Sequence, residues 1–278
     1  METLSSPKGG SDLEAMAAAL RGKAVEMSHA ASSAHLGSSL SCSDVLAAAY
    51  WNVLNVDATQ PGDPLRDRFI LSKGHAASSL YAALALKGFF PMELLETYCT
   101  DGALLAEHPP ANQLPGVEAA TGSLGHGLPI GCGIALAAQI RSQNYRVYVL
   151  MSDGECNEGS VWEAAMFAAA RELTNLCVII DYNKWQATGR SDETLRLAPL
   201  RDKWEKFGWN AIEVDGHDVL ELAYKMRDVP SSTGMPTALI AHTVKGKGVS
   251  FMEDDNNWHY RSPSAEEVIL AHRELGLI

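Results

Sequence analysis

Two short apolar runs with a helix-forming segment between them constrain the fold of this chain more than any other feature. The runs are residues 147–151 and 177–180, and the intervening residues 158–173 are rich in alanine. Short, uninterrupted apolar runs are typical of parallel strands that are buried on both faces. Two such strands joined by a helix form a right-handed βαβ crossover. The sequence therefore predicts an α/β fold with a doubly wound, mainly parallel sheet flanked by helices.

Polar residues follow each run, at the predicted carboxyl edge of the sheet, where open α/β sheets bind ligands. Asp153 and Gly154 follow the first run, and Asn183 and Trp185 follow the second. One carboxylate, one amide oxygen and one backbone carbonyl can surround a hard cation such as Mg²⁺, which also takes phosphate oxygens. Backbone N–H groups around Gly154 favour an anionic diphosphate. Each residue alone also fits a plain turn or strand-end cap, but their combination favours a metal–diphosphate site.

Seven short blocks, in one order along residues 13–259, resemble the N-terminal half of transketolase, a thiamine diphosphate enzyme. Within them, Asp153-Gly154 with Asn183 resembles the thiamine diphosphate motif. The blocks occupy residues 33–37, 67–75, 107–109, 121–127, 152–159, 214–218 and 243–248. The resemblance implies the diphosphate-binding module of the thiamine diphosphate fold. We expect one domain over residues 13–278, preceded by a flexible segment, residues 1–12. Within the domain, residues 186–201 are expected to form an irregular surface segment.

The resemblance also implies roles for individual residues. Asp153, Asn183 and the Trp185 carbonyl would bind Mg²⁺, with Ca²⁺ or Mn²⁺ as substitutes. Three histidines would orient the hydroxyls of the donor sugar and move protons, namely His35, His75 and His108. The residues that would surround thiamine diphosphate are His75, Gly122, Ser123, Leu124, Gly154, Glu158, Asn183 and His259. A histidine in a loop is ordinarily solvated. A functional role for these histidines is favoured because their positions match those of histidines in the family. Glu158 would lie at a subunit interface beside the cofactor.

Three residues depart from the family pattern. His126 stands where the family commonly has Gln, and we expect no catalytic role for it. Ser152 replaces the Gly that usually opens the Asp-Gly motif, but it is also small. Lys73 resembles the residue that the two-gene versions of the enzyme have at the matching position, where single-chain versions often have Asn.

The matched blocks belong to only one of the two modules that transketolase chemistry needs. In the family, a glutamate of the pyrimidine-binding module activates the cofactor, and this sequence stops at Ile278. The resemblance therefore implies one subunit of a split transketolase, active only with a second chain in an α₂β₂ tetramer. Its reaction would transfer a two-carbon ketol unit from a ketose to an aldose, acting on sugars or sugar phosphates.

Three alternatives remain open at this stage. The α subunit of a 2-oxo acid dehydrogenase shares the Asp-Gly and Asn pattern, but it lacks the set of His35, His75 and His108. A nicotinamide-binding Rossmann domain would carry G-x-G-x-x-G after its first strand, which this sequence does not. A non-catalytic scaffold is disfavoured by the intact Asp153 and Asn183.

Composition limits the setting in which the protein works. The net charge of −12 argues against a nucleic-acid-binding surface. Five cysteines without a CxxC pair suit a reducing compartment. Residues 1–12 lack the apolar core of a signal peptide, and no apolar run approaches the roughly 20 residues of a membrane span. We expect a soluble, cytoplasmic protein.

Overall fold

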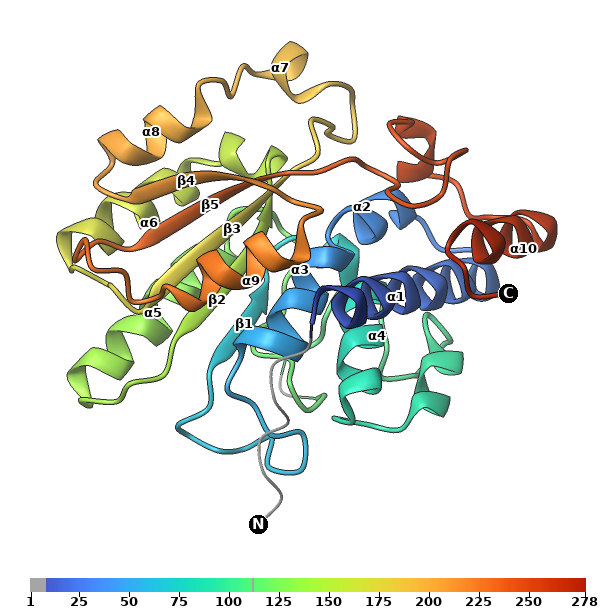
Figure 1. Cartoon of the computed structure of the whole chain (residues 1–278), viewed down its shortest axis with the longest axis horizontal. Coiled ribbons are helices and arrows are strands. Elements are labelled where there is room, and N and C mark those ends of the chain that lie inside the picture. The colour runs from blue at the N-terminus through green and yellow to red at the C-terminus, as the bar shows by residue number, and fades with distance from the viewer. Residues whose placement is uncertain (1–8, 112) are drawn as a thin grey trace.

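A five-stranded parallel sheet forms the centre of the molecule, with the strand order β1-β2-β3-β5-β4. The computed structural model describes residues 9–111 and 113–278. Helices lie on both sides of the sheet, as Figure 1 shows. This arrangement confirms the predicted fold class. The strands are β1 (Arg68–Leu71), β2 (Val147–Ser152), β3 (Leu176–Tyr182), β4 (Asn210–Asp215) and β5 (Thr237–His242).

The helices follow the predicted alternation with the strands, and several are short. The α-helices are α1 (Gly10–Ala31), α2 (Leu36–Ser41), α3 (Ser43–Ala48), α4 (Ala77–Lys87), α5 (Gly127–Ile140), α6 (Gly159–Ala170), α7 (Ser191–Thr194), α8 (Leu200–Lys206), α9 (Val219–Arg227) and α10 (Ala265–Glu274). The π-helical turn η1 (Ala49–Val53) extends α3, and the 3₁₀ turns are η2 (Gly74–Ala76), η3 (Met92–Thr97), η4 (Gly154–Asn157) and η5 (Asn256–His259).

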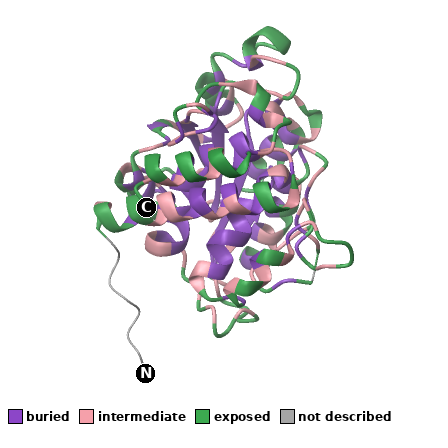
Figure 2. Cartoon of the chain, turned by 90° about the vertical axis from the view of Figure 1, so that its right-hand side faces the viewer, coloured by how far each residue is buried: buried purple, intermediate pink, exposed green. Residues whose placement is uncertain are grey.

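Side chains of the central strands point alternately into two cores, one on each face of the sheet. Val147 and Val149 pack with α5, α6 and α8, whereas Tyr148 and Leu150 pack with α1, α3, α4 and α9. This period of two is the geometry of a strand that is buried on both sides. Figure 2 shows the buried residues concentrated in the interior, with exposed residues on the outer helix faces. The two cores fix the carboxyl edge of the sheet, where the polar loops meet.

A third, smaller core supports the loops beside that edge. Trp258, Leu36 and Val25 are among its buried members, so it joins η5 and α2 to the long helix α1. The C-terminal helix α10 lies beside α1 (Figure 1). This packing determines where the loops that carry His35 and His259 lie.

The structure differs from the sequence expectations at two places. Helix α1 begins at Gly10, inside the segment that we expected to precede the domain, and residues 1–8 of that segment lie outside the described residues. Residues 186–201, expected to be an irregular surface segment, contain α7 and the start of α8. Ser191 is buried there because its hydroxyl contacts Asp153. Over residues 9–111 and 113–278, no helix combines the length and apolarity of a membrane span.

Candidate active site

A cavity of about 320 Å³ lies at the carboxyl ends of β1, β2 and β3. The segments that follow all three strands contribute to its wall, as expected for an open parallel sheet. Loops from distant parts of the chain complete it. The lining residues are His35, Ser38, His75, His108, Gly122, Leu124, Ser152, Gly154, Asn183, Trp185, Gln186, Ala187, Thr188 and His259.

Four of these lining residues are histidines, and their imidazole rings lie close together. The ring centroid of His35 is 4.8 Å from that of His259, 5.6 Å from that of His75 and 6.0 Å from that of His108. The backbone N–H of His35 donates to the carbonyl of His259 at 3.0 Å. His35 also has a φ of +67°, a left-handed conformation that is uncommon for residues other than glycine and often marks functional sites.

Burial keeps several of these imidazoles neutral. It lowers the pKa of His259 to about 3, with the charge of Lys245 as the next cause. It also lowers the pKa of His75 well below its ordinary value, assisted by Lys73. The pKa of His35 is lowered by burial as well, against a raising effect of Glu107. Neutral imidazoles can both donate and accept hydrogen bonds to sugar hydroxyls.

The loop of residues 121–127 approaches the end of β1 so closely that glycine is needed. A Cβ on Gly74 would lie 2.7 Å from the carbonyl carbon of Thr121 and 2.8 Å from the nitrogen of Gly122. A Cβ on Gly122 would lie 3.2 Å from the imidazole ring of His108. Because a side chain would push these backbones apart, the glycines bring Gly122 and Leu124 to the cavity.

Glu155 joins this loop to the Asp-Gly turn, and sequence reasoning did not single it out. Its buried carboxylate accepts hydrogen bonds from Ser72 Oγ, from the N–H of Gly125 at 2.9 Å and from the N–H of Ser152 at 2.9 Å. Ser72 Oγ in turn accepts from the N–H of Gly127 at 3.2 Å. The sequence feature that could have identified Glu155 is a carboxylate inside a motif that follows a buried strand.

Asp153 is fully buried, with a carboxylate that has only uncharged hydrogen-bond donors. Oδ1 accepts from the N–H of Gly154 at 2.9 Å, and Oδ2 accepts from the N–H of Lys184 at 2.9 Å and from Ser191 Oγ at 2.7 Å. Burial raises the pKa of Asp153 to about 7. Within residues 9–111 and 113–278, no basic side chain forms an ion pair with this carboxylate. An added cation would offset the free-energy cost of burying the ionised carboxylate, so the site fits a divalent metal ion.

The other oxygens near Asp153 suit a hard cation rather than zinc. Asn183 lines the cavity with an amide whose Oδ1 accepts from the N–H of Trp185 at 3.0 Å. The described residues contain no group of three or more His, Cys, Asp or Glu side chains arranged to hold a metal. A set of one carboxylate, one amide and backbone oxygens is a Mg²⁺ or Ca²⁺ donor set that leaves room for phosphate.

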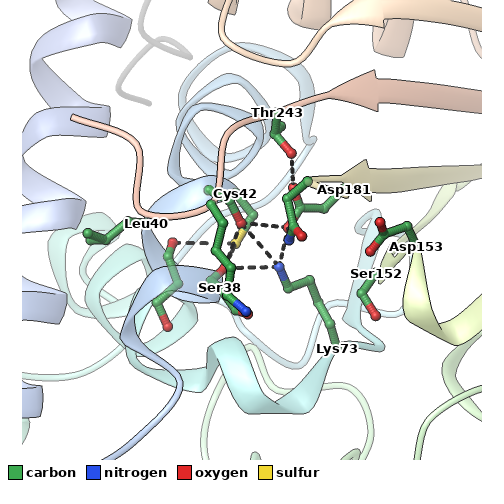
Figure 3. A network of polar contacts seen from close by, with 12 residues as sticks. Ser38, Leu40, Cys42, Lys73, Ser152, Asp153, Asp181 and Thr243 are labelled. Carbon is green, nitrogen blue, oxygen red and sulfur yellow. Dashed lines mark hydrogen bonds and ion pairs between the residues drawn. The ribbon is translucent and has the colours of Figure 1, made fainter. Parts of the chain in front are cut away.

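A buried ion pair lies directly beside this site (Figure 3). Lys73 Nζ pairs with Asp181 Oδ2, and both side chains are fully buried. Lys73 Nζ also donates to the carbonyl of Ser38 at 2.9 Å. Thr243 Oγ1 donates to the other oxygen of Asp181. The network links α2 and β3 to the residues that follow β1 and β5.

A second buried lysine was also missed by sequence reasoning. Lys245 Nζ donates to Asn256 Oδ1 at 2.7 Å and lies 3.3 Å from Nδ1 of His259. Burial, assisted by the charge of Lys73, lowers its pKa to about 8. The two lysines give this end of the cavity local positive charge despite the net charge of −12. The block of residues 243–248 contained Lys245, but its pattern alone gave no reason to prefer it over Lys247.

The family model described as "Transketolase, thiamine diphosphate binding domain" matches residues 13–278. The chain belongs to this family. It is 42% identical over 255 residues to one subunit of the apulose-4-phosphate transketolase of Phocaeicola vulgatus, covering 92% of this chain and 90% of the relative. It is 45% identical over 219 residues to the 6-deoxy-6-sulfo-D-fructose transketolase subunit SqwG of Clostridium sp., covering 79% and 80%.

Solved transketolase structures show the same fold. The transketolase of Campylobacter jejuni superimposes with a TM-score of 0.88 at 28% identity, over 97% of this chain and 43% of that chain. That of Leishmania mexicana gives a TM-score of 0.89 at 27% identity, over 95% and 41%. The chain thus spans about two fifths of these transketolases, whereas it matches the relatives named as subunits over most of their length. These matches confirm the predicted resemblance to the N-terminal, cofactor-binding subunit of a split transketolase.

Three of the residues implied by the transketolase resemblance are absent from the cavity wall. Asp153 is fully buried next to the lining residue Gly154, and the other two residues are exposed. Ser123 is exposed, and its neighbours Gly122 and Leu124 provide the lining instead. Glu158 is exposed at the N-terminus of α6. A Cβ added to Gly125 would lie 2.6 Å from the Cβ of Glu158. Neither side chain contributes to the wall of the cavity within this chain.

Proposed function

We propose that this chain is the diphosphate-binding subunit of a thiamine-diphosphate- and Mg²⁺-dependent transketolase. It would transfer a two-carbon ketol unit from a ketose to an aldose, either free sugars or sugar phosphates. The observation that carries the proposal is one cavity that joins the predicted histidines to Gly154 and Asn183. Thiamine diphosphate supplies the nucleophilic carbon when it is bound. The protein supplies binding, orientation and proton movement.

The metal would be held by Asp153, Asn183 and the Trp185 carbonyl, with Ca²⁺ or Mn²⁺ as substitutes for Mg²⁺. The buried carboxylate, which forms no ion pair in the part of the chain that the structure describes, supports this assignment. The backbone of Gly154 and the ammonium of Lys245 would face the diphosphate. His75 and His259, which line the same cavity, would contribute ring N–H groups to it. Gly122, Ser123 and Leu124 would add contacts from the opposite loop.

His35, His75 and His108 would hold the donor sugar and move its protons. Their rings converge on one side of the cavity, with His35 6.0 Å from His108 and 5.6 Å from His75. The lowered pKa of His35 and His75 keeps these rings neutral near pH 7, so each has one nitrogen that can accept a proton.

A partner subunit with the pyrimidine module would dock on the face formed by α5 and α6. Ile130, Met166 and Phe167 are exposed there, with Met166 53% accessible. Between the two helices, small residues such as Gly133 and Ala164 line a groove of about 460 Å³. Glu158 and Ser123 lie exposed near the start of α6 and the start of α5, where the partner would complete the active site.

We further propose an α₂β₂ assembly of these two chains, with residues 13–278 as a single domain. The free cysteines of the described residues suit the reducing cytoplasm. Contiguous exposed apolar side chains on neighbouring helices are typical of a protein interface, which supports a heteromeric enzyme.

The test is ketol transfer from a simple ketose to ribose 5-phosphate with thiamine diphosphate and Mg²⁺. The chain is assayed alone and in complex with the partner subunit from its native host. Activity in the complex alone is the expected result. Activity of the isolated chain would contradict the need for a partner. If the complex lacks ketol transfer but oxidatively decarboxylates a 2-oxo acid, the dehydrogenase alternative replaces this function.

A further inference from the structure

A carboxylate outside the cavity lining touches one of the cavity histidines. Nδ1 of His35 lies 3.1 Å from Oε1 of Glu107. The Glu107 side chain is 40% exposed and that of His35 is 23% exposed. Neither the metal assignment nor the diphosphate assignment uses Glu107. The contact joins two loops that are 72 residues apart in the sequence.

Both members of this pair are held by their backbones. His35 is anchored by the hydrogen bond from its N–H to the carbonyl of His259. The segment that carries Glu107 is anchored by Leu105, which is fully buried, and by Tyr81, whose hydroxyl donates to the carbonyl of Ala106 at 2.9 Å. The geometry of the contact is therefore determined by the fold and does not depend on two free surface side chains meeting.

The contact decides which nitrogen of His35 carries the hydrogen. An ionised carboxylate only accepts hydrogen bonds, so Nδ1 of His35 must be the donor. In the neutral ring, Nε2 is then left with its lone pair. A nearby negative charge also favours the imidazolium, which makes Nε2 a stronger base.

We propose that Glu107 is a positioning residue that fixes the tautomer of His35 and strengthens it as the base for the donor sugar. When the C2–C3 bond of the donor is cleaved, the proton of the C3 hydroxyl passes to Nε2, and the O–H electron pair becomes the second C–O bond of the aldose product. The electron pair of the broken C–C bond stays with the two-carbon ketol unit, for which thiamine diphosphate would supply the electron sink. Nδ1 keeps its hydrogen, and Glu107 stays ionised and stabilises the imidazolium. This inference rests on the proposed transketolase function.

Other charged and titratable groups face His35 and work against Glu107. The rings of His75, His108 and His259 surround it, and Lys245 adds positive charge. Burial is the largest cause that lowers the pKa of His35, and Glu107 is the largest that raises it. Removing the carboxylate charge should therefore weaken the base.

The first arm of the test is an NMR titration of the histidine rings in the isolated chain, with the His35 signal assigned from a His35→Gln variant. We expect the Nδ1–H tautomer for His35. Glu107→Gln, which keeps an accepting oxygen, should preserve this tautomer but move the titration to lower pH. Glu107→Ala should lose the tautomer preference. An Nε2–H tautomer in the unmodified chain, or an unchanged titration in Glu107→Gln, would overturn the proposal.

The second arm measures ketol transfer by the complex with the partner subunit. Glu107→Gln should lower kcat about tenfold and leave KM almost unchanged. This loss is smaller than the roughly 10²- to 10⁴-fold that general acid–base catalysis contributes, because His35 itself remains. The acidic limb of the pH profile of kcat should move to lower pH, because a weaker base loses its proton earlier. Glu96→Gln, an exposed carboxylate on η3, is the matched control and should change nothing.

The outcomes separate this inference from the function on which it rests. A loss of kcat without a shift of the acidic limb would mean that Glu107 is only structural, which overturns the inference. An inactive wild-type complex would refute the transketolase function, and the titration of His35 would still decide whether Glu107 governs the ring.

Discussion

Asp153 and Asp181 are two buried carboxylates at the same edge of the sheet with opposite electrostatic environments. Asp153 follows β2, and Asp181 lies near the end of β3, paired in register with Ser152. Burial disfavours the ionised form of both. For Asp181, the charge and hydrogen bond of Lys73 outweigh burial and hold its pKa below the ordinary value. For Asp153, the hydrogen-bond donors are neutral, and burial, assisted by the charge of Asp181, raises its pKa to about 7.

The difference shows how one sheet edge can hold a permanent ion pair beside a site that still needs a cation. Lys73 neutralises Asp181 within the chain, so that carboxylate is part of the folded framework. Asp153 has three hydrogen-bond donors that fix its direction, but among the described residues it has no ion-pair partner. Since an unbalanced buried charge is costly, the carboxylate of Asp153 is suited to an added metal ion.

The largest effect should come from breaking the internal pair. Lys73→Met leaves Asp181 buried without a cation, which costs about 3–5 kcal/mol in the free energy of unfolding. Urea unfolding of the isolated chain measures this, with Lys206→Met on the exposed face of α8 as a control. Adding Asp181→Asn to Lys73→Met should recover part of the loss. A loss below about 1 kcal/mol would show that Asp181 does not depend on Lys73.

Removing the carboxylate of Asp153 should affect the metal more than the fold. Asp153→Ala should weaken Mg²⁺-dependent retention of thiamine diphosphate by at least about 100-fold, since even indirect supporting residues of metal sites contribute 10- to 100-fold. Equilibrium binding by calorimetry on the complex measures it. Asp202→Ala, an exposed carboxylate on α8, serves as the control. Unchanged retention would remove Asp153 from the metal site.

The two carboxylates should also give opposite pH dependence in the metal-free chain. Because the folded pKa of Asp153 lies above its unfolded value, its contribution favours the folded state at low pH. That contribution is lost as the pH rises from about 4 to about 7, by at most about 1.4 kcal/mol per pH unit. For Asp181, with a lowered pKa, the contribution is present above about pH 4 and is lost on acidification.

Subtracting the stability of Asp153→Ala from that of the wild type at each pH isolates the Asp153 contribution. The difference should decline over this window without Mg²⁺, and saturating Mg²⁺ with thiamine diphosphate should remove the decline. A flat difference in the metal-free chain would show that Asp153 already has a balancing charge.

The smallest effect should come from single hydroxyl donors. Ser191→Ala removes the hydrogen bond to Asp153 Oδ2 and should lower metal affinity roughly tenfold, as for other supporting residues of metal sites. Thr243→Val removes the matching donor to Asp181 and should leave metal affinity unchanged while reducing stability. Metal titrations of both variants compare the two carboxylates directly. Equal losses of affinity would mean that the two carboxylates act as one site.

The sequence by itself determined the parallel sheet, because buried strands have a local signature. The runs at 147–151 and 177–180 became β2 and β3 with ends shifted by at most two residues. The Asp-Gly turn and Asn183 followed from their position after these strands. The histidines of the cavity came from the family blocks, since no local pattern distinguishes His35 from a solvated loop histidine.

Only the tertiary structure decided which polar groups meet at the sheet edge. Lys73 reaches Asp181 across 108 residues, Ser191 reaches Asp153 across 38, and Glu107 reaches His35 across 72. Such pairings depend on how loops pack above the strands. No local pattern of residues in a single sequence indicates that packing. Strand formation is a property of neighbouring residues, whereas the balance of buried charge in this protein is a property of the assembled edge.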